Sequence, residues 1–351
     1  MLVNAIKWLN GSAIASAKVW PAGYSSGGSL MLVANNKSEE IADILSIAEE
    51  SETELDLIVE EGISLKEIYE QNFLKGDLIL STASNQSLAG RNYKDQSRWV
   101  RNQVERLEKT TGHKPTGLFP VDWDYNKATM KALVRDNMTY VMGNREPRNY
   151  GPEIVNIKPG EWWSFLLRKV PFGNIPKGQL SMLEYRNSGV TGSSGFYNAM
   201  SNDIQRIQST GGMYLGVLDT DIIHAENALN LPNLLTNRMR QNGMWHTSMS
   251  KLVQRYIGWH GLRVSTKNVT SRRIMISISN EGKTAVHDIS FNLYLPSEFA
   301  GVFLQSQVTH LEPRDVKWNR TNGFCSFGLP KIDPGDNAVL YADLFVEGEM
   351  N

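Results

Sequence analysis

Residues 1–255 alternate short apolar stretches with segments in which apolar residues recur at helical spacing. The apolar stretches have the length of buried strands, and each intervening segment is long enough for a helix. Strands are expected at Ser29–Asn35, Glu54–Glu60, Asp77–Thr82, Thr116–Val121, Thr139–Asn144 and Gly212–Asp219. Helices are expected at 37–51, 64–74, 96–112 and 126–137. Strands that alternate with helices predict a parallel sheet or barrel.

The pattern changes at about residue 262. Apolar residues now alternate with polar ones, first at Ile274, Ile276 and Ile278 and again from Ile289 to Leu295. Turn residues separate the two runs, which favours antiparallel strands. We therefore expect two domains, a barrel over residues 1–261 and an all-β, immunoglobulin-like sandwich over residues 262–351.

Composition excludes several classes of function. The 351 residues carry a formal net charge of −1, so no basic surface is available for nucleic acid. No apolar run is long enough for a membrane span. The single cysteine, Cys325, excludes an internal disulfide and a cysteine-rich metal site. The first residues resemble an amphipathic helix rather than a signal peptide, which leaves open an upstream domain or assembly partner.

Two acidic clusters follow predicted strands. Asp122 and Asp124 flank Trp123, with Tyr125 next, and Asp219 and Asp221 flank a threonine. Both clusters are expected at the mouth of the barrel, where the carboxyl ends of the strands meet. One interpretation is a sugar subsite in which aromatic rings stack on the sugar and carboxylates accept its hydroxyl protons. A cation held by the four carboxylates and simple helix capping are the alternatives.

Other candidate chemistry is sparse. None of the six histidines is spaced three or four residues from another, which favours surface or locally hydrogen-bonded roles over metal ligation. We expect an irregular region that includes residues 161–163 and 188–200. It contains adjacent tryptophans, Trp162 and Trp163, and a Gly/Ser-rich loop at 188–200 that is either a lid or a long connection.

Several stretches resemble the polysaccharide deacetylase family of metal-dependent carbohydrate esterases. The sequence "LEKTTGHKPTGLFPVDWDYNKATMKALVRDNMTYVMGN" resembles the region of the family's third motif, and "GGMYLGVLDTDII" resembles its last barrel strand. The resemblance covers roughly residues 1–262. It implies a deformed (β/α)7-type barrel of the glycoside hydrolase and deacetylase kind, with a polysaccharide as substrate. It also implies a divalent metal held by one Asp and two His, a second Asp as base and a late His as acid.

The chain departs from this pattern at each matched position. The paired aspartates fall on Asn35 and Asn36, and the HxxxH pair falls on Thr82 and Gln86. The arginine of an aromatic-Arg-Pro motif falls on Phe119. The late histidine falls near Asp219. Since neutral side chains cannot replace imidazole on zinc or act as a base, we expect that the family's zinc site is lost and that no cofactor is bound.

Three hypotheses follow. The first is a catalytically inactive, deacetylase-like protein that binds glycan or has a structural role in the cell envelope or extracellular matrix. The second is a glycan-active enzyme, a deacetylase or glycosidase-like hydrolase, that uses Asp122, Asp124, Asp219 or Asp221. The third is a purely structural surface or filament protein.

Overall fold

The computed structural model describes most of the chain as two compact units, residues 25–253 and residues up to 24 together with those from 254 onward. The described residues are 13–34, 37–63, 65, 75–82, 87–120, 125–143, 153–156, 161–166, 181–295, 299–307, 311–319, 321 and 323–346. Helix α10 (Met249–His260) crosses the division between the units. None of the helices in these ranges is long and apolar enough to cross a membrane.

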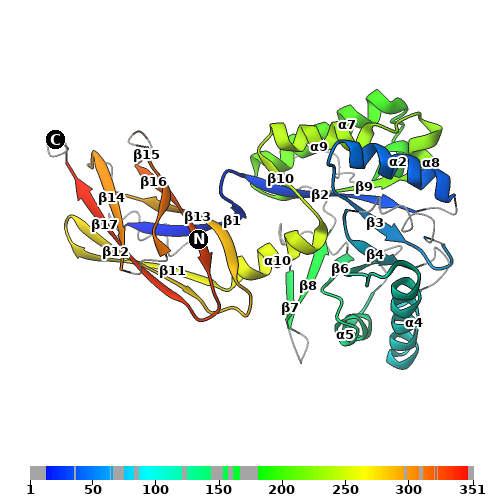
Figure 1. Ribbon diagram of the computed structural model, residues 1–351, viewed down its shortest axis with the longest axis horizontal. Coiled ribbons are helices and arrows are strands. Elements are labelled where there is room, and N and C mark those ends of the chain that lie inside the picture. Colours follow the sequence, from blue (N-terminus) through cyan, green and yellow to red (C-terminus); the bar gives the residue numbers. More distant parts are fainter. Residues whose placement is uncertain are drawn as a thin grey trace. The chain divides into compact units, whose positions relative to one another are not determined.

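The first unit is built on a curved sheet of parallel strands (Figure 1). Seven parallel strands of the described ranges follow one another in the order β9-β2-β3-β4-β5-β6-β8, and β7 is antiparallel to β8. Their bounds are β2 Ser26–Val33, β3 Leu55–Val59, β4 Leu78–Ser81, β5 Gly117–Phe119, β6 Tyr140–Gly143, β7 Glu153–Asn156, β8 Glu161–Leu166 and β9 Met213–Asp219. A short strand, β10 (Met244–His246), pairs with the beginning of β2. The six strands expected from the sequence are confirmed, and the sheet forms a parallel half-barrel.

Helices cover the outer face of this sheet. In Figure 1, α2, α7, α8 and α9 lie beside β2 and β9, whereas α4 and α5 lie beside β4 and β6. Their bounds are α2 Ser38–Glu50, α4 Tyr93–Thr111, α5 Lys127–Arg135, α6 Met182–Asn187, α7 Gly192–Ser209, α8 Thr220–Ala225 and α9 Leu231–Gln241. Three of the four expected helices are confirmed as α2, α4 and α5. The fourth, at 64–74, lies almost entirely outside the described residues.

The region expected to be irregular contains regular structure. Trp162 and Trp163 belong to β8, and the Gly/Ser-rich segment forms the start of α7. Helix α7 buries Phe196, Met200 and Ile204, which recur every four residues and face the rest of the unit. Tertiary burial of this apolar stripe overrides the low helix propensity of its first turn, so the prediction of a loop was wrong.

The second unit consists of two four-stranded antiparallel sheets that share a hydrophobic core. The sheet orders are β1-β13-β16-β15 and β11-β12-β17-β14. The strands are β1 Ile14–Pro21, β11 Leu262–Thr270, β12 Arg273–Asn280, β13 Val286–Tyr294, β14 Gly301–Ser306, β15 Arg314–Asn319, β16 Phe324–Ile332 and β17 Asn337–Phe345. Alternate residues of β12 and β13 point into the core, as their period of two predicted. This core is the basis for the β-sandwich.

The first strand of the chain belongs to this sandwich. β1 pairs antiparallel with β13, from Ile14 opposite Tyr294 to Pro21 opposite Ile289 (Figure 1). The expected division into residues 1–261 and 262–351 therefore differs from the compact units of the structure. β1 also pairs with β13 and not with β11, the next strand of the sandwich along the chain. That order differs from an immunoglobulin constant domain, in which the first two strands are neighbours.

Arg255 connects three separate backbone segments of the second unit. Its guanidinium donates hydrogen bonds to the carbonyl oxygens of Val19 (2.6 Å), Asp288 (3.1 Å) and His287. Burial lowers the pKa of Arg255 to about 10, and the Asp288 carboxylate opposes that change. A buried arginine that is satisfied by carbonyl groups in this way holds α10 against β1 and β13.

In the first unit, a buried aspartate, Asp56, and a half-buried one, Asp77, meet the first turn of α10. Asp56, near the start of β3, accepts hydrogen bonds from Ser29 Oγ (2.6 Å) and from the backbone nitrogens of Asp77 (2.7 Å) and Met249 (2.9 Å). Asp77 accepts from the backbone nitrogen of Ser250 (2.6 Å) and from its hydroxyl (2.9 Å). These carboxyl groups satisfy helix N–H groups that have no partner within the helix.

We predict that this pair makes the stability of the protein depend on pH. Burial raises the pKa of Asp56 to about 8, and the Asp77 carboxylate adds to the rise. The unfolded chain has an ordinary pKa of about 3.9, so between these values the folded protein holds a proton that the unfolded chain releases. The free energy of unfolding should therefore fall as the pH rises from about 4 to about 8.

Urea denaturation across this pH range measures the effect, with Asp56→Asn as the comparison. The variant loses an acceptor for the Met249 N–H group and should be less stable at low pH. The informative quantity is therefore the slope of the free energy of unfolding against pH. The slope should be smaller in Asp56→Asn, because the amide does not titrate. Equal slopes in the two proteins would contradict the prediction.

Candidate functional site

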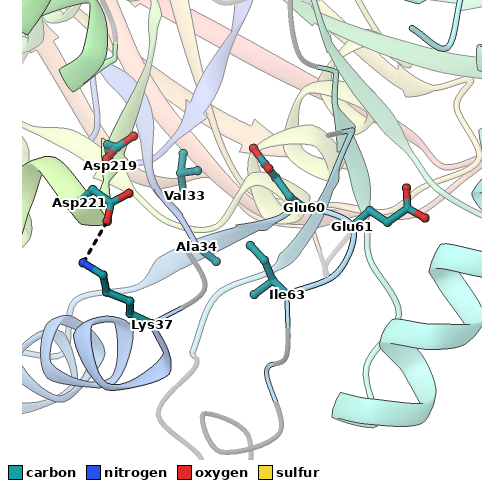
Figure 2. A pocket seen from close by; sticks show the side chains of 8 residues that line it. All are labelled: Val33, Ala34, Lys37, Glu60, Glu61, Ile63, Asp219 and Asp221. Carbon is teal, nitrogen blue, oxygen red and sulfur yellow. Dashed lines mark ion pairs between the residues drawn. The ribbon is translucent and has the colours of Figure 1, made fainter. Parts of the chain in front are cut away.

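A cavity of about 410 Å³ opens where β2, β3 and β9 end (Figure 2). The residues that line it are Val33, Ala34, Lys37, Glu60, Glu61, Ile63, Asp219 and Asp221. Each of them is the last residue of one of these strands or follows within four residues of its end. The carboxyl ends of parallel strands are the usual place for sites in folds of this kind.

Backbone pairing sets the walls of this cavity. β2 pairs with β3 on one side and with β9 on the other, and Val33 lies opposite both Ile58 and Asp219. Beyond the strands, the Ala34 nitrogen donates to the Ile58 carbonyl oxygen at 2.9 Å. Thr220 Oγ1 donates to the Val33 carbonyl oxygen at 2.6 Å. The three strand ends are thus held together by hydrogen bonds that continue past the sheet.

Asp219 is the last residue of β9 and the N-cap of α8. Its Oδ1 accepts a hydrogen bond from the backbone nitrogen of Ile222 at 3.0 Å, which fixes the side chain at the edge of the cavity. Burial raises the pKa of Asp219, and the bond from Ile222 opposes the rise. The negative charge of Asp221 raises the pKa further. Asp219 therefore caps α8 through Oδ1, and it also lines the cavity.

Glu60 follows β3 directly and points into the same space as Asp219 (Figure 2). Burial raises the pKa of Glu60, and repulsion from the Asp219 carboxylate raises it further. Among the described residues, none donates a hydrogen bond to the Glu60 side chain. Two carboxyl groups thus face one cavity, and the Asp219 carboxylate makes ionisation of Glu60 less favourable.

The other charged side chains of the cavity have partners. Lys37 Nζ lies 2.7 Å from Glu40 Oε1 and 3.6 Å from Asp221 Oδ1. Its hydrogen bond to Glu40 is the main reason that the pKa of Lys37 is raised. Glu61 turns toward α4, where it accepts hydrogen bonds from Trp99 Nε1 (3.1 Å) and Gln103 Nε2 (2.9 Å) (Figure 2).

The structure brings together only part of the predicted site. Asp219 and Asp221 line the cavity. Thr82 follows β4, Phe119 ends β5 and Tyr125 precedes α5, and none of these three lines the cavity. The remaining predicted residues lie outside the described part of the chain: Asn35, Asn36, Gln86, Asp122, Trp123 and Asp124.

The sequence analysis missed Glu60, Glu61 and Lys37. Glu60 and Glu61 come directly after a predicted strand, which is the same feature that singled out Asp219 and Asp221. The five charged residues of the cavity in the described ranges all stand at the end of a parallel strand or within four residues after it, and this position is the signal that marks them.

The donors at the cavity do not fit a histidine-based metal site. Residues 25–253 contain three histidines, His113, His224 and His246, and the structure describes all of them. His113 precedes β5 and His246 lies on β10, both at the amino ends of the strands. His224 Nε2 lies 3.0 Å from the Glu40 carbonyl oxygen. Among the described residues, no group of three or more His, Cys, Asp or Glu is arranged to hold a metal ion.

Replacing Asp219 should change the ionisation of Glu60. We predict that Asp219→Asn lowers the pKa of Glu60, because the repulsion between the two carboxylates is removed while the amide still caps α8. Carbon-13 NMR titration of the glutamate carboxyl groups measures this shift. Asp221→Asn is the control and should leave the Glu60 pKa nearly unchanged. An identical Glu60 titration in wild type and Asp219→Asn would show that the carboxylates do not interact.

Comparison with known proteins identifies the fold. No family model matches the sequence, and no curated protein matches it. A protein from Mycobacterium smegmatis assigned as a polysaccharide deacetylase has a TM-score of 0.55 and 13% sequence identity, over 68% of this chain and 92% of its own. A chitin deacetylase from the fungal pathogen Colletotrichum lindemuthianum has a TM-score of 0.44 and 11% identity, over 66% of this chain and 88% of its own.

A CE4 family pseudoenzyme from Bacillus anthracis has a TM-score of 0.41 and 10% identity, over 67% of this chain and 66% of its own. The mycobacterial protein confirms the fold that the sequence resemblance predicted. Over about two thirds of its length, this chain has the fold of a polysaccharide deacetylase.

Proposed function

We propose that this protein binds a polysaccharide at the mouth of its barrel and does not deacetylate it. The observation that carries the proposal is the donor set of the cavity. Carboxylates from β3 and β9 stand at the strand ends, whereas every histidine of residues 25–253 lies elsewhere or bonds to a backbone carbonyl oxygen. Carboxylates are suited to accept charge-assisted hydrogen bonds from the hydroxyl groups of a sugar.

The size of the cavity agrees with a saccharide ligand. Its volume of about 410 Å³ lies within the range of about 300–1,000 Å³ that is typical of small-molecule sites. Val33, Ala34 and Ile63 supply apolar surface between the charged groups, as a sugar ring with polar edges requires. Trp123 and Asp124, which lie outside the described residues, remain proposed ligand-binding residues.

The lack of a catalytic donor set supports the non-catalytic part of the proposal. Metal-dependent deacetylation needs a Lewis acid that lowers the pKa of bound water, and a base that takes its proton. The residues of the cavity do not form a fitting metal site with imidazole ligands. We propose that the zinc site is lost and that no other cofactor is bound.

The same fold suggests where the protein acts. Because polysaccharides are abundant outside the cell, we propose an extracellular or cell-envelope location. The sandwich would serve as an accessory domain.

A second function is favoured by the two carboxyl groups with raised pKa values. Glycosidases use one protonated and one ionised carboxyl group on either side of the scissile bond. Glu60 and Asp219 face one cavity, and burial favours the protonated form of each. A hydrolase acting on a glycan with Glu60 and Asp219 is therefore the alternative function.

Binding and turnover separate these proposals. The full chain should bind oligosaccharides of glucosamine type in isothermal titration calorimetry, and Asp219→Asn should weaken binding about tenfold, as expected for one charge-assisted hydrogen bond. Asp315→Asn, an exposed position with φ of 51° on the sandwich, is the control and should bind like wild type. Acetate release from acetylated chito-oligosaccharides should stay at background, even with added Zn²⁺ or Co²⁺.

Three outcomes decide among the functions. Stoichiometric Zn²⁺ together with acetate release would refute the non-catalytic proposal. Cleavage of any glycan that is abolished in both Glu60→Gln and Asp219→Asn would establish the hydrolase. Failure to bind any saccharide would remove both functions and favour a structural role.

A further inference from the structure

The charges of the cavity are unequal. Among the described residues that line it, Glu60, Glu61, Asp219 and Asp221 are acidic, and the cation Lys37 lies beside Glu40 and Asp221. Glu61 is directed to Trp99 and Gln103 on α4. Glu60 and Asp219 are left facing the open space, each with a negative charge when ionised (Figure 2).

We propose that this cavity selects a cationic saccharide, a sugar with a free amino group, over the N-acetylated form of the same sugar. The inference rests on the proposed function, because it names the class of glycan that the same site takes. A deacetylase takes an N-acetylated glycan as its substrate. The ligand proposed here is instead a glycan from which acetyl groups have already been removed. A separate N-deacetylation reaction must therefore supply this ligand.

The physical reason is the repulsion that the Asp219 carboxylate exerts on the Glu60 carboxylate, both of them half-buried. An ammonium group between Glu60 and Asp219 would offset this repulsion. It would also donate charge-assisted hydrogen bonds to both carboxylates. An acetamido group is neutral, so it leaves the repulsion in place. Partial burial strengthens the attraction, since water and salt screen these charges less than exposed ones.

The described residues around the pair supply little positive charge. Arg186 lowers the pKa of Asp219 only as the last of five contributions, after burial, Ile222 and Asp221. Burial and Asp219 alone account for the raised pKa of Glu60, with no cation among the causes. A metal ion is a poor alternative occupant, because no group of three ligating residues is found in the described ranges. The ligand itself therefore provides the best source of positive charge.

The test compares two ligands that differ only in acetylation. Calorimetric titrations with a glucosamine tetramer and an N-acetylglucosamine tetramer are carried out at about pH 6, where amines of this kind are largely protonated. Wild type should bind the amine tetramer at least about tenfold more tightly than the acetylated one. This difference should shrink when salt is raised from about 50 to about 200 mM.

Two variants and two matched controls locate the effect. Glu60→Gln and Asp219→Asn should each weaken binding of the amine tetramer about tenfold and change binding of the acetylated tetramer less than about threefold. The controls Glu312→Gln and Asp315→Asn remove the same charges from exposed positions of the sandwich and should change neither affinity. Circular dichroism melting curves show whether each variant is folded.

The outcomes separate this inference from the proposed function. Equal affinity for the two tetramers, or tighter binding of the acetylated one, would overturn the selectivity and leave glycan binding in place. An equal loss in the surface controls would overturn it as well, because the preference would then come from the overall charge. Binding of neither tetramer would overturn the proposed function itself.

Discussion

The pairing of β9 with β2 is the constraint on which the candidate site depends. β2 is the first strand of this sheet along the chain, and β9 follows almost two hundred residues later. Their register nevertheless places Val33 opposite Asp219. The bond from Thr220 to the Val33 carbonyl oxygen carries the contact beyond the strands. Since β3 pairs with the other edge of β2, Glu60 joins Asp219 at the same edge of the sheet. Without this pairing, the two carboxyl groups would have no common cavity.

Acidic residues occupy both edges of the sheet in different chemical states. At the amino edge, Asp56 and Asp77 are surrounded by hydroxyl and backbone donors, and they hold the first turn of α10. At the carboxyl edge, Glu60 lacks a hydrogen-bond donor among the described residues. Burial raises the pKa of all three acids, but only the carboxyl edge leaves acceptor capacity that a ligand can use. The same residue type therefore stabilises the fold at one edge and shapes a cavity at the other.

Much of the fold could be predicted because its strands are buried on both faces. β2, β3 and β4 are almost continuously apolar and buried, which is the pattern that parallel strands show in sequence. Two features could not be predicted. The helical start of α7 is rich in glycine and serine, and packing of its apolar stripe decides its structure. β1 carries no mark of its distant partner, because pairing with β13 depends on contacts more than two hundred residues away.

The sequence by itself determined which residues form strands, the change from parallel to antiparallel structure, and the absence of histidine pairs with metal-ligand spacing. These properties are local, because each depends on side-chain type and spacing within a few residues. It also placed Asp219 and Asp221 at a strand end. Only the tertiary structure decided that Glu60 faces Asp219, that Glu61 turns away to α4, and that Lys37 is held by Glu40 and Asp221. The reason is that charge interactions act across space, and the distances that set them arise from strand order and register.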